Sequence, residues 1–400
     1  MSRSVTAGRN PAAVSALAPG GLEAPRILGR IEAPDPGPTL IIVGGMHGNE
    51  PAGVKAMQRL LPRLAADPSG LVRGRVVGLT GNRKALRQKR RYLAHDLNRH
   101  WLPERIRRLR ATHAPLDGED EELKELNGEI ERLLYEAQET VYLLDLHTTS
   151  GPELPFATLD DTLRNRPFAF AFPVPVVLGL EEELAGTLSS YVAALGVVTA
   201  GFESGQHDAP AAVDRAEAAI WIALEASGVL RPGSRPEVAA ARDRLAVENG
   251  GLPPVVEIRY RHAVTPEDEF RMDPGYTNFQ PVARGQRLGC DRRGPTASPE
   301  DGLILMPLYQ AQGADGFFVV RRVHRIWLKA SAVVRHWRFE RYLHLLPGVR
   351  HHPEVAGGFI VDRRYARWLA LELFHLLGFS RHGAAARQLV MTRRRYDYTP

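Results

Sequence analysis

Short apolar segments alternate with helical stretches between residues 26 and 226, and this alternation limits the possible folds more than any other feature. The apolar segments are rich in β-branched residues and are bounded by Gly or Pro, which is typical of strands. They are Arg26–Ile31, Thr39–Gly44, Arg75–Thr80, Val141–His147, Val174–Leu178 and Val197–Phe202. Apolar residues at helical spacing occur in Pro51–Leu64, Glu119–Glu136, Glu181–Leu195 and Ala211–Ala226. This order predicts an α/β domain with a mainly parallel sheet flanked by helices.

Changes in composition divide the chain into five predicted segments. Residues 1–24 are rich in Ala, Gly, Ser and Pro, which is typical of a flexible arm, and residues 25–230 hold the α/β domain. Residues 231–254 resemble a linker. Residues 255–323 contain short apolar segments with frequent Gly and Pro, which predict a small β domain. Residues 324–400 return to helix-like patterns, so we expect a basic helical extension.

The last 80 residues are basic and aromatic. Residues 321–400 hold 16 Lys and Arg against 5 Asp and Glu, and they include Trp327, Trp337 and Trp368. Such a surface could bind a nucleic acid or another anionic surface. The segment YARWLALELFHLLG instead places Leu, Ala and Trp at helical spacing, which favours packing on the core or an oligomer interface. We prefer the second interpretation.

Several classes of protein are excluded by what the chain lacks. Cys290 is the only cysteine, so neither an internal disulfide framework nor a cysteine-based zinc site can form. No apolar run approaches the roughly 20 residues that a transmembrane helix needs. The N-terminus has no continuous apolar region of the kind found in secretory signals. We therefore expect a cytoplasmic protein without a membrane partner.

The strongest chemical signal lies in a glycine-rich loop after the second strand candidate. There, GGMHGNEPAG places His47 and Glu50 three residues apart. Ligand sites in α/β sheets form outside the carboxyl ends of the strands, and His147 ends another apolar strand, VYLLDLH. Two histidines and one glutamate leave a fourth zinc position open, as in catalytic zinc sites. The alternative is that His147 is an ordinary histidine at a strand end.

Other polar residues follow the same pattern. Asp145 lies two residues before His147, so it points to the same face of the strand and could orient a ligand histidine. Another predicted strand ends at Glu203 in GFESGQ, where a carboxylate can reach a water molecule on the metal. The stretch RRYLAHDLNRHW contains Arg91 and, in DLNR, Asn98 and Arg99. Arginine binds carboxylates through its planar fork, so these residues suggest an anionic substrate, unless they simply belong to a solvated basic run.

Together HGNE, RRYLAHDLNR, DLH and GFESGQ resemble the succinylglutamate desuccinylase/aspartoacylase family, which belongs to the wider zinc carboxypeptidase-like fold. The later segments PGYTNFQPVARGQRLG and PEDGLILMP look like the small β domain of that family. The resemblance covers roughly residues 26–323. It implies a mixed sheet flanked by helices, one Zn²⁺ per chain, and hydrolysis of the amide bond of an N-acyl amino acid.

The resemblance also implies a role for each motif residue. His47, Glu50 and His147 match the zinc ligands, and Arg91 matches the residue that polarises the scissile carbonyl. Asn98 and Arg99 match the residues that hold a substrate carboxylate. Glu203 matches the group that activates water and then protonates the leaving amine, and Asp96 supports the loop. Two other functions stay open. One is a metallocarboxypeptidase-like peptidase of the same fold, and the other is a binding protein for nucleic acid or an anionic surface. A β domain that closes over the pocket would favour small substrates.

Overall fold

The computed structural model describes residues 22–397, apart from 69, 115, 153, 338, 356, 363–373, 375, 386 and 387. The predicted N-terminal arm therefore lies mostly outside the described residues. Its last residues pack on the α/β domain, since Leu22 and Ala24 are buried against Val54 and Leu86. Among the described residues, no helix is long and apolar enough to cross a membrane.

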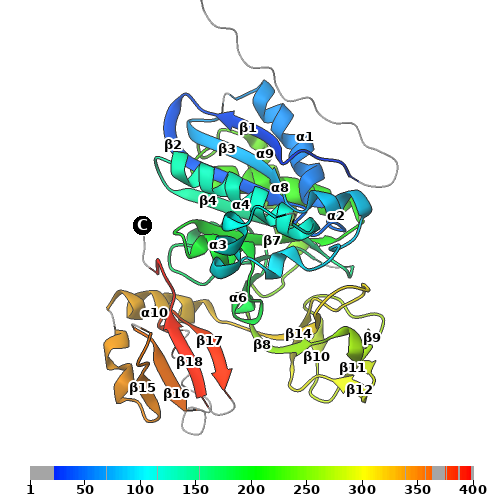
Figure 1. The fold of residues 1–400 in the computed structure, drawn as a ribbon, viewed down its shortest axis with the longest axis vertical. Helices are drawn as coiled ribbons and strands as arrows, with labels where there is room; N and C mark the ends of the chain where they lie inside the picture. The colour runs from blue at the N-terminus through cyan, green and yellow to red at the C-terminus, as the bar shows by residue number, and fades with distance from the viewer. Residues whose placement is uncertain are drawn as a thin grey trace, which may run out of the picture.

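An 11-stranded mixed sheet runs through the molecule in the order β1-β3-β2-β4-β7-β5-β6-β8-β14-β13-β10 (Figure 1). Its strands are β1 (Ile27–Glu32), β2 (Asp35–Gly44), β3 (Arg73–Thr80), β4 (Val141–Thr149), β5 (Phe156–Thr158), β6 (Val176–Leu178), β7 (Val198–Gln206), β8 (Val255–Ala263), β10 (Pro281–Val282), β13 (Gly302–Leu305) and β14 (Asp315–Arg322). Strand β2 is parallel to β3 and β4, and β4 is parallel to β7. The predicted fold class is confirmed, and the carboxyl ends of β2, β4 and β7 meet at one edge.

Helices cover both faces of the central strands. The helices are α1 (Ala52–Ala66), α2 (Arg83–Gln88), α3 (Pro103–Ala111), α4 (Gly118–Glu136), α5 (Arg166–Ala169), α6 (Leu180–Glu183), α7 (Leu188–Ala193), α8 (Pro210–Ala226) and α9 (Pro236–Asn249), with a 3₁₀ turn η1 (Leu97–Arg99). Leu40 and Ile42 of β2 pack with α1, α8 and α9, whereas Ile41 and Val43 pack with α3, α4 and α7. Burial on both faces explains why this strand is a continuous apolar run.

Two predicted segments differ from the structure. The helix expected over Glu181–Leu195 is split into α6 and α7, because Gly186 between them has φ +71° and a Cβ there would lie 2.3 Å from the carbonyl oxygen of Arg99. The expected linker 231–254 contains α9, whose buried residues are Val238, Ala241 and Leu245. Their spacing of three and four residues forms one apolar stripe, which packs against α8.

Residues 255–323 continue the main sheet. Strand β8 pairs parallel to β6 and antiparallel to β14, and a 3-stranded sheet of β12 (Gly294–Ala297), β11 (Arg287–Asp291) and β9 (Arg271–Met272) lies beside them. The 3₁₀ turn η2 (Pro266–Asp268) precedes β9. The small β unit is thus joined to the α/β domain through shared strand pairing.

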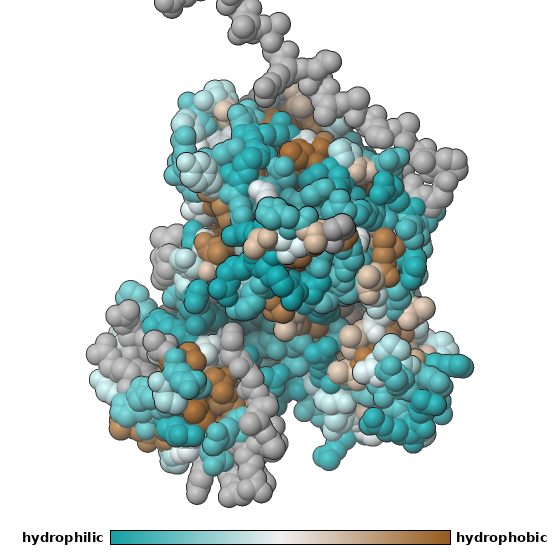
Figure 2. All heavy atoms as spheres, in the orientation of Figure 1, coloured by the Kyte–Doolittle hydropathy of each residue, from teal (hydrophilic) through white to brown (hydrophobic). Residues whose placement is uncertain are grey.

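The C-terminal segment is not the helical extension that the sequence predicts, because most of its described elements are strands. It begins with α10 (Arg325–His336) and a 3₁₀ turn η3 (Phe339–Leu345), and then forms a 4-stranded antiparallel sheet of β15 (Val349–His351), β16 (Phe359–Asp362), β18 (Gln388–Arg393) and β17 (Phe379–Ala385). These strands are short, and they form a core with Phe374 that their local sequence does not reveal. Most of YARWLALELFHLLG, including Trp368, lies outside the described residues. On the face drawn in Figure 2, hydrophobic side chains are visible on this C-terminal lobe.

Candidate active site

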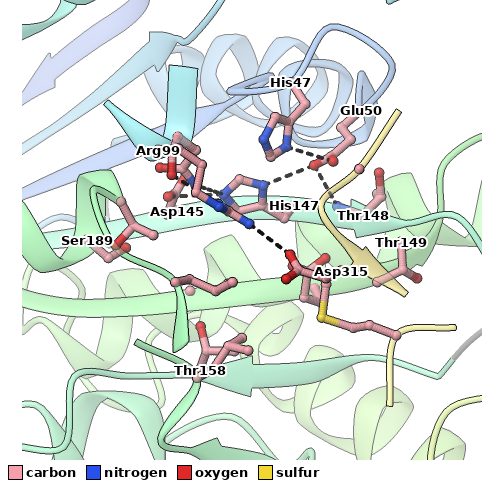
Figure 3. A pocket seen from close by; sticks show the side chains of 18 of the residues that line it. His47, Glu50, Arg99, Asp145, His147, Thr148, Thr149, Thr158, Ser189 and Asp315 are labelled. Atoms are coloured by element: carbon pink, nitrogen blue, oxygen red, sulfur yellow. Dashed lines mark hydrogen bonds and ion pairs between the residues drawn. The ribbon is translucent and has the colours of Figure 1, made fainter. Parts of the chain in front are cut away.

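One cavity at the carboxyl ends of the central strands brings most of the predicted site residues together (Figure 3). The predicted residues that line it are His47, Glu50, Arg91, Asn98, Arg99, Asp145, His147 and Glu203. The loop between β13 and β14 adds residues 306–308, Gln310 and residues 313–315 from the small β unit. The cavity is therefore built by the α/β domain and closed on one side by the β unit.

The loop after β2 presents His47 and Glu50 to this cavity. Gly48 allows the loop to turn tightly against α2, since a Cβ at this position would lie 2.1 Å from the backbone carbon of Ala85. Both functional side chains are buried, and Nδ1 of His47 lies 2.8 Å from Oε1 of Glu50. The glycines thus hold an imidazole and a carboxylate side by side at the strand end.

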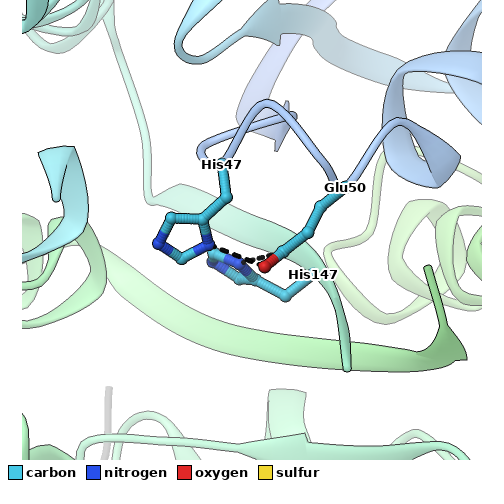
Figure 4. Close-up of side chains that lie close together, drawn as sticks. All are labelled: His47, Glu50 and His147. Carbon is cyan, nitrogen blue, oxygen red and sulfur yellow. Dashed lines mark hydrogen bonds and ion pairs between the residues drawn. The ribbon is translucent and has the colours of Figure 1, made fainter. Parts of the chain in front are cut away.

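His147 on β4 completes the cluster (Figure 4). Its Nδ1 lies 3.0 Å from Oε2 of Glu50, and one ligand atom from each of the three residues lies within 4.8 Å of the others. Burial alone would lower the pKa of His147, but Asp145 and Glu50 outweigh it and raise that pKa well above its usual range. A metal at this position must therefore displace a proton, as metals bound by histidine generally do.

The remaining ring nitrogens show that the donor set fits Zn²⁺. Nε2 of His47 lies 3.0 Å from Oδ1 of Asp96, and Nε2 of His147 lies 3.1 Å from Oδ2 of Asp145. Histidines that bind metals usually donate their second ring N–H to a carboxylate, which fixes the tautomer and the ring orientation. Both Nδ1 atoms are then available to a metal, together with the carboxylate of Glu50.

Glu203 lies on the strand next to His147. The two residues are register partners in the parallel pair β4 and β7, so their side chains point to the same face of the sheet. Burial raises the pKa of Glu203 to about 7. Its Oε2 is buried and has no hydrogen-bond partner within the described part of the chain. A carboxyl group in this setting can accept and return a proton near neutral pH.

Arg91 is fixed by two carboxylates. Its Nη1 donates to Oε1 of Glu50 at 3.2 Å, and its Nη2 donates to Oδ2 of Asp96 at 3.1 Å. Asp96 also accepts a hydrogen bond from the backbone N–H of Asn98 at 2.9 Å, which caps the 3₁₀ turn η1. Asp96 therefore holds His47, Arg91 and the DLNR turn in one arrangement.

Asn98 and Arg99 connect this arrangement to more distant parts of the chain. Nδ2 of Asn98 lies 3.4 Å from Nε2 of His147, and its Oδ1 accepts a hydrogen bond from the N–H of Leu188 at 2.8 Å. Arg99 donates from Nη2 to Asp315 at 3.2 Å, and Asp315 also pairs with Arg261 at 2.6 Å. Two arginines thus share one carboxylate, so the trio of Arg99, Asp315 and Arg261 carries one net positive charge.

Sequence reasoning missed His207, Gln310 and Asp315. The Oγ1 of Thr148 lies 2.7 Å from Nδ1 of His207, and Nε2 of His207 donates to Oε1 of Gln310 at 3.0 Å. The same oxygen accepts from Nδ2 of Asn49 at 2.8 Å. His207 could have been noticed because it follows Glu203 by four residues, whereas no local pattern marks Gln310 or Asp315.

A second group of possible metal ligands lies outside the cavity. His95, Asp117 and Glu119 also place ligand atoms within 4.8 Å of one another. The carboxylate of Glu119 already accepts hydrogen bonds from the backbone N–H groups of Leu93 and Ala94 at 2.6 and 3.0 Å. Its role is therefore explained by the loop that it holds.

The segment that contains the candidate site residues is similar to known proteins. The family model described as "Succinylglutamate desuccinylase/Aspartoacylase catalytic domain" matches residues 36–221. These residues are similar to the catalytic domain of the succinylglutamate desuccinylase/aspartoacylase family. The family segment includes every residue predicted to act in catalysis, substrate binding or metal binding.

Curated relatives of the family match shorter stretches. A succinylglutamate desuccinylase of Photorhabdus laumondii is 31% identical over 166 residues, which cover 38% of this chain and 48% of that protein. One from Pseudomonas fluorescens is 43% identical over 68 residues, which cover 17% of this chain and 20% of that protein. The matched segments of the chain thus span about half, or less, of the length of these relatives.

Solved structures of the family share the fold over a longer range. A succinylglutamate desuccinylase/aspartoacylase from Rhodobacter sphaeroides has a TM-score of 0.54 at 21% identity, covering 73% of this chain and 87% of that chain. The product-bound ectoine utilization protein EutE (DoeB) from Ruegeria pomeroyi has a TM-score of 0.51 at 20% identity, with the same coverage. At these identities the likeness establishes the fold.

Proposed function

We propose that the protein is a zinc-dependent amidohydrolase that cleaves the amide bond of an N-acyl amino acid. The observation that carries this proposal is the convergence of His47, Glu50 and His147 on one point, with Glu203 beside them in the same cavity. The family match of residues 36–221 supports it. A cytoplasmic location is compatible with the single cysteine, Cys290, and stays a prediction.

In this proposal His47, Glu50 and His147 would hold one Zn²⁺, which supplies Lewis-acid activation of water and of the scissile carbonyl near neutral pH. Glu203 accepts a proton from the attacking water and then returns it to the leaving nitrogen. Its position one strand from His147 and its raised pKa suit both steps.

Arg91 is the proposed donor to the charge that develops on the carbonyl oxygen. Its two terminal nitrogens are held by Glu50 and Asp96, which fixes the plane of the guanidinium group. Its Nε is buried without a hydrogen-bond partner among the described residues. A donor that is already oriented stabilises an oxyanion without a cost of reorganisation during the reaction.

Asn98 and Arg99 are the proposed anchors for the substrate carboxylate. The net positive charge of Arg99 and Arg261 around Asp315 favours one anionic group at this side. Residues between 306 and 315 form one wall of the cavity, and we take this wall to favour a small substrate over the polypeptide that a carboxypeptidase-like activity would need.

A substrate screen tests the proposal. The zinc-loaded protein is assayed against N-acetyl and N-succinyl amino acids, together with His147→Ala as a metal-site variant. We expect hydrolysis by the wild-type protein and loss of both zinc and activity in the variant. Stoichiometric zinc in His147→Ala, or a zinc-loaded wild type that hydrolyses none of these amides, would overturn the proposal.

A further inference from the structure

The C-terminal segment reaches the wall of the candidate active-site cavity through one buried arginine. Arg394 follows β18, and its side chain is 4% exposed. Its Nε pairs with Oδ1 of Asp160 at 3.2 Å, and its Nη2 pairs with Glu181 at 3.0 Å and Glu182 at 2.5 Å. Asp160 and Glu181 line the cavity. One arginine from outside the family segment therefore holds two residues of the cavity wall.

Helix α6 connects Arg394 to Arg99, which is a predicted anchor for the substrate carboxylate. Glu181 and Glu182 belong to this helix, and the carbonyl oxygen of Glu183 at its end accepts a hydrogen bond from Arg261. Arg261 pairs with Asp315, which pairs with Arg99. Because α6 has only 4 residues, its own backbone bonds cannot hold it firmly. Its position therefore depends on contacts from other elements: Leu180 packs in a buried core, and Arg381 and Arg394 of the C-terminal segment pair with its carboxylates.

We propose that Arg394 is a positioning residue of the substrate cavity: it holds α6 and the wall formed by Asp160 and Glu181 in place from the C-terminal segment. It also neutralises part of the negative charge of that wall. This role rests on the proposed function, because it requires a substrate that occupies the cavity.

Arg335 provides a matched control in the same segment. Its side chain is fully buried, and it pairs with Asp161 at 2.8 Å and Asp397 at 3.1 Å. Neither partner lines the cavity. Loss of Arg335 therefore leaves two carboxylates without this cation, and loss of Arg394 leaves three, but only the loss of Arg394 releases the cavity wall.

The test compares Arg394→Met with Arg335→Met in the full zinc-loaded chain. For an N-acyl amino acid that the wild type hydrolyses, we expect Arg394→Met to raise KM about tenfold or more while kcat and zinc content change little, which is the signature of lost binding. Arg335→Met is expected to keep the wild-type KM at temperatures where it stays folded.

Hydrogen exchange at the backbone amides of α6 gives a readout that does not need turnover. We expect faster exchange at residues 180–184 in Arg394→Met and unchanged exchange there in Arg335→Met. Arg394→Lys is the milder variant, and it should recover only part of the effect because an ammonium group cannot span three carboxylates. If Arg394→Met fails to fold, the lysine variant carries both measurements.

The outcomes separate this inference from the proposed function. Equal changes of KM in Arg394→Met and Arg335→Met would mean a general loss of stability and would overturn the positioning role. Wild-type KM and unchanged exchange in Arg394→Met would also overturn it. If the zinc-loaded wild type hydrolyses no N-acyl amino acid, the proposed function fails, and exchange in α6 alone then decides whether Arg394 holds the wall.

Discussion

Two buried clusters of charged side chains are completed in different ways. The proposed metal-binding edge consists of His47, Glu50 and His147 at the cavity, whereas the C-terminal side lies around Arg335, whose partners do not line the cavity. At the metal-binding edge, two histidine Nδ1 atoms face the carboxylate of Glu50, so three donor atoms converge on one point. At the C-terminal side, Arg335 lies between Asp161 and Asp397, and Arg166 pairs with Asp161 as well. There each carboxylate already has a cation from the chain.

The difference indicates which buried cluster awaits a ligand. Buried charges are tolerated when they are paired, and a pair that the chain supplies in full has a structural role. At the other cluster, Glu50 is paired with Arg91 and with two imidazoles, and an imidazole that gives up its proton can bind a metal. We therefore expect substitutions at the metal-binding edge to change activity and metal affinity, and substitutions at the C-terminal side to change stability.

The largest expected effect is that of Glu203→Gln. Glutamine keeps the shape of the side chain but cannot accept a proton, so kcat should fall by about 10²–10⁴-fold with little change in KM. The measurement is steady-state kinetics with zinc content determined on the same sample. Near wild-type turnover in a variant that retains its zinc would place the base elsewhere.

Arg335→Met should have the largest effect on stability. Removing one partner of a buried ion pair leaves an uncompensated charge, which typically costs about 3–5 kcal/mol. Denaturant unfolding of the variant should show this loss, while zinc affinity stays at the wild-type value. A matching loss of zinc affinity would break the separation between the two clusters.

Asp145→Asn tests the interaction between this carboxylate and the second ring nitrogen of His147. The residue contacts Nε2 of His147 at 3.1 Å, and loss of such a partner typically costs about 10–100-fold in metal affinity or activity. Competition with a chelator of known affinity measures the change. Asp161→Asn serves as the comparison, since it should lower stability and leave zinc affinity unchanged.

The pH dependence of kcat/KM should sharpen the role of Glu203. The carboxylate must be ionised to accept a proton, so activity should fall about tenfold per pH unit below the pKa of the base. Burial raises that pKa to about 7 in the metal-free chain, and a bound cation can only lower it. The acid limb should therefore lie at or below pH 7, and a limb well above pH 7 would assign it to another group.

The smallest effect expected is that of Arg99→Lys. Arg99→Ala should raise KM more than it lowers kcat, because a substrate carboxylate is held equally in the ground and transition states. Lysine should restore only part of the affinity, since it lacks the planar fork. Unchanged KM in Arg99→Ala for every anionic substrate would remove this residue from the binding site.

Much of the α/β domain could be predicted from the sequence alone. The strands are short apolar runs between glycines and prolines, and every one of the six predicted segments overlaps an observed strand. The linker and the C-terminal extension were predicted wrongly for a physical reason. Helix α9 has a sparse apolar stripe, and β15 and β16 have 3 and 4 residues, so neither pattern stands out until its tertiary partner is known.

The candidate site also contains residues that could be predicted from the sequence and residues that could not. His47 and Glu50 follow β2, and His147 and Glu203 lie near the carboxyl ends of β4 and β7. The carboxyl ends of parallel strands meet at one edge, so the proximity of these residues could be inferred from local patterns. Asp315 and Arg394 lie in segments with no such rule. Asp315 is 216 residues from Arg99 and Arg394 is 213 residues from Glu181, and long-range packing alone brings these charges together. The polar residues at the strand ends can therefore be read from local patterns. The distant charges that complete the walls of the cavity cannot, because a buried charge takes its partner from whichever segment the fold brings beside it.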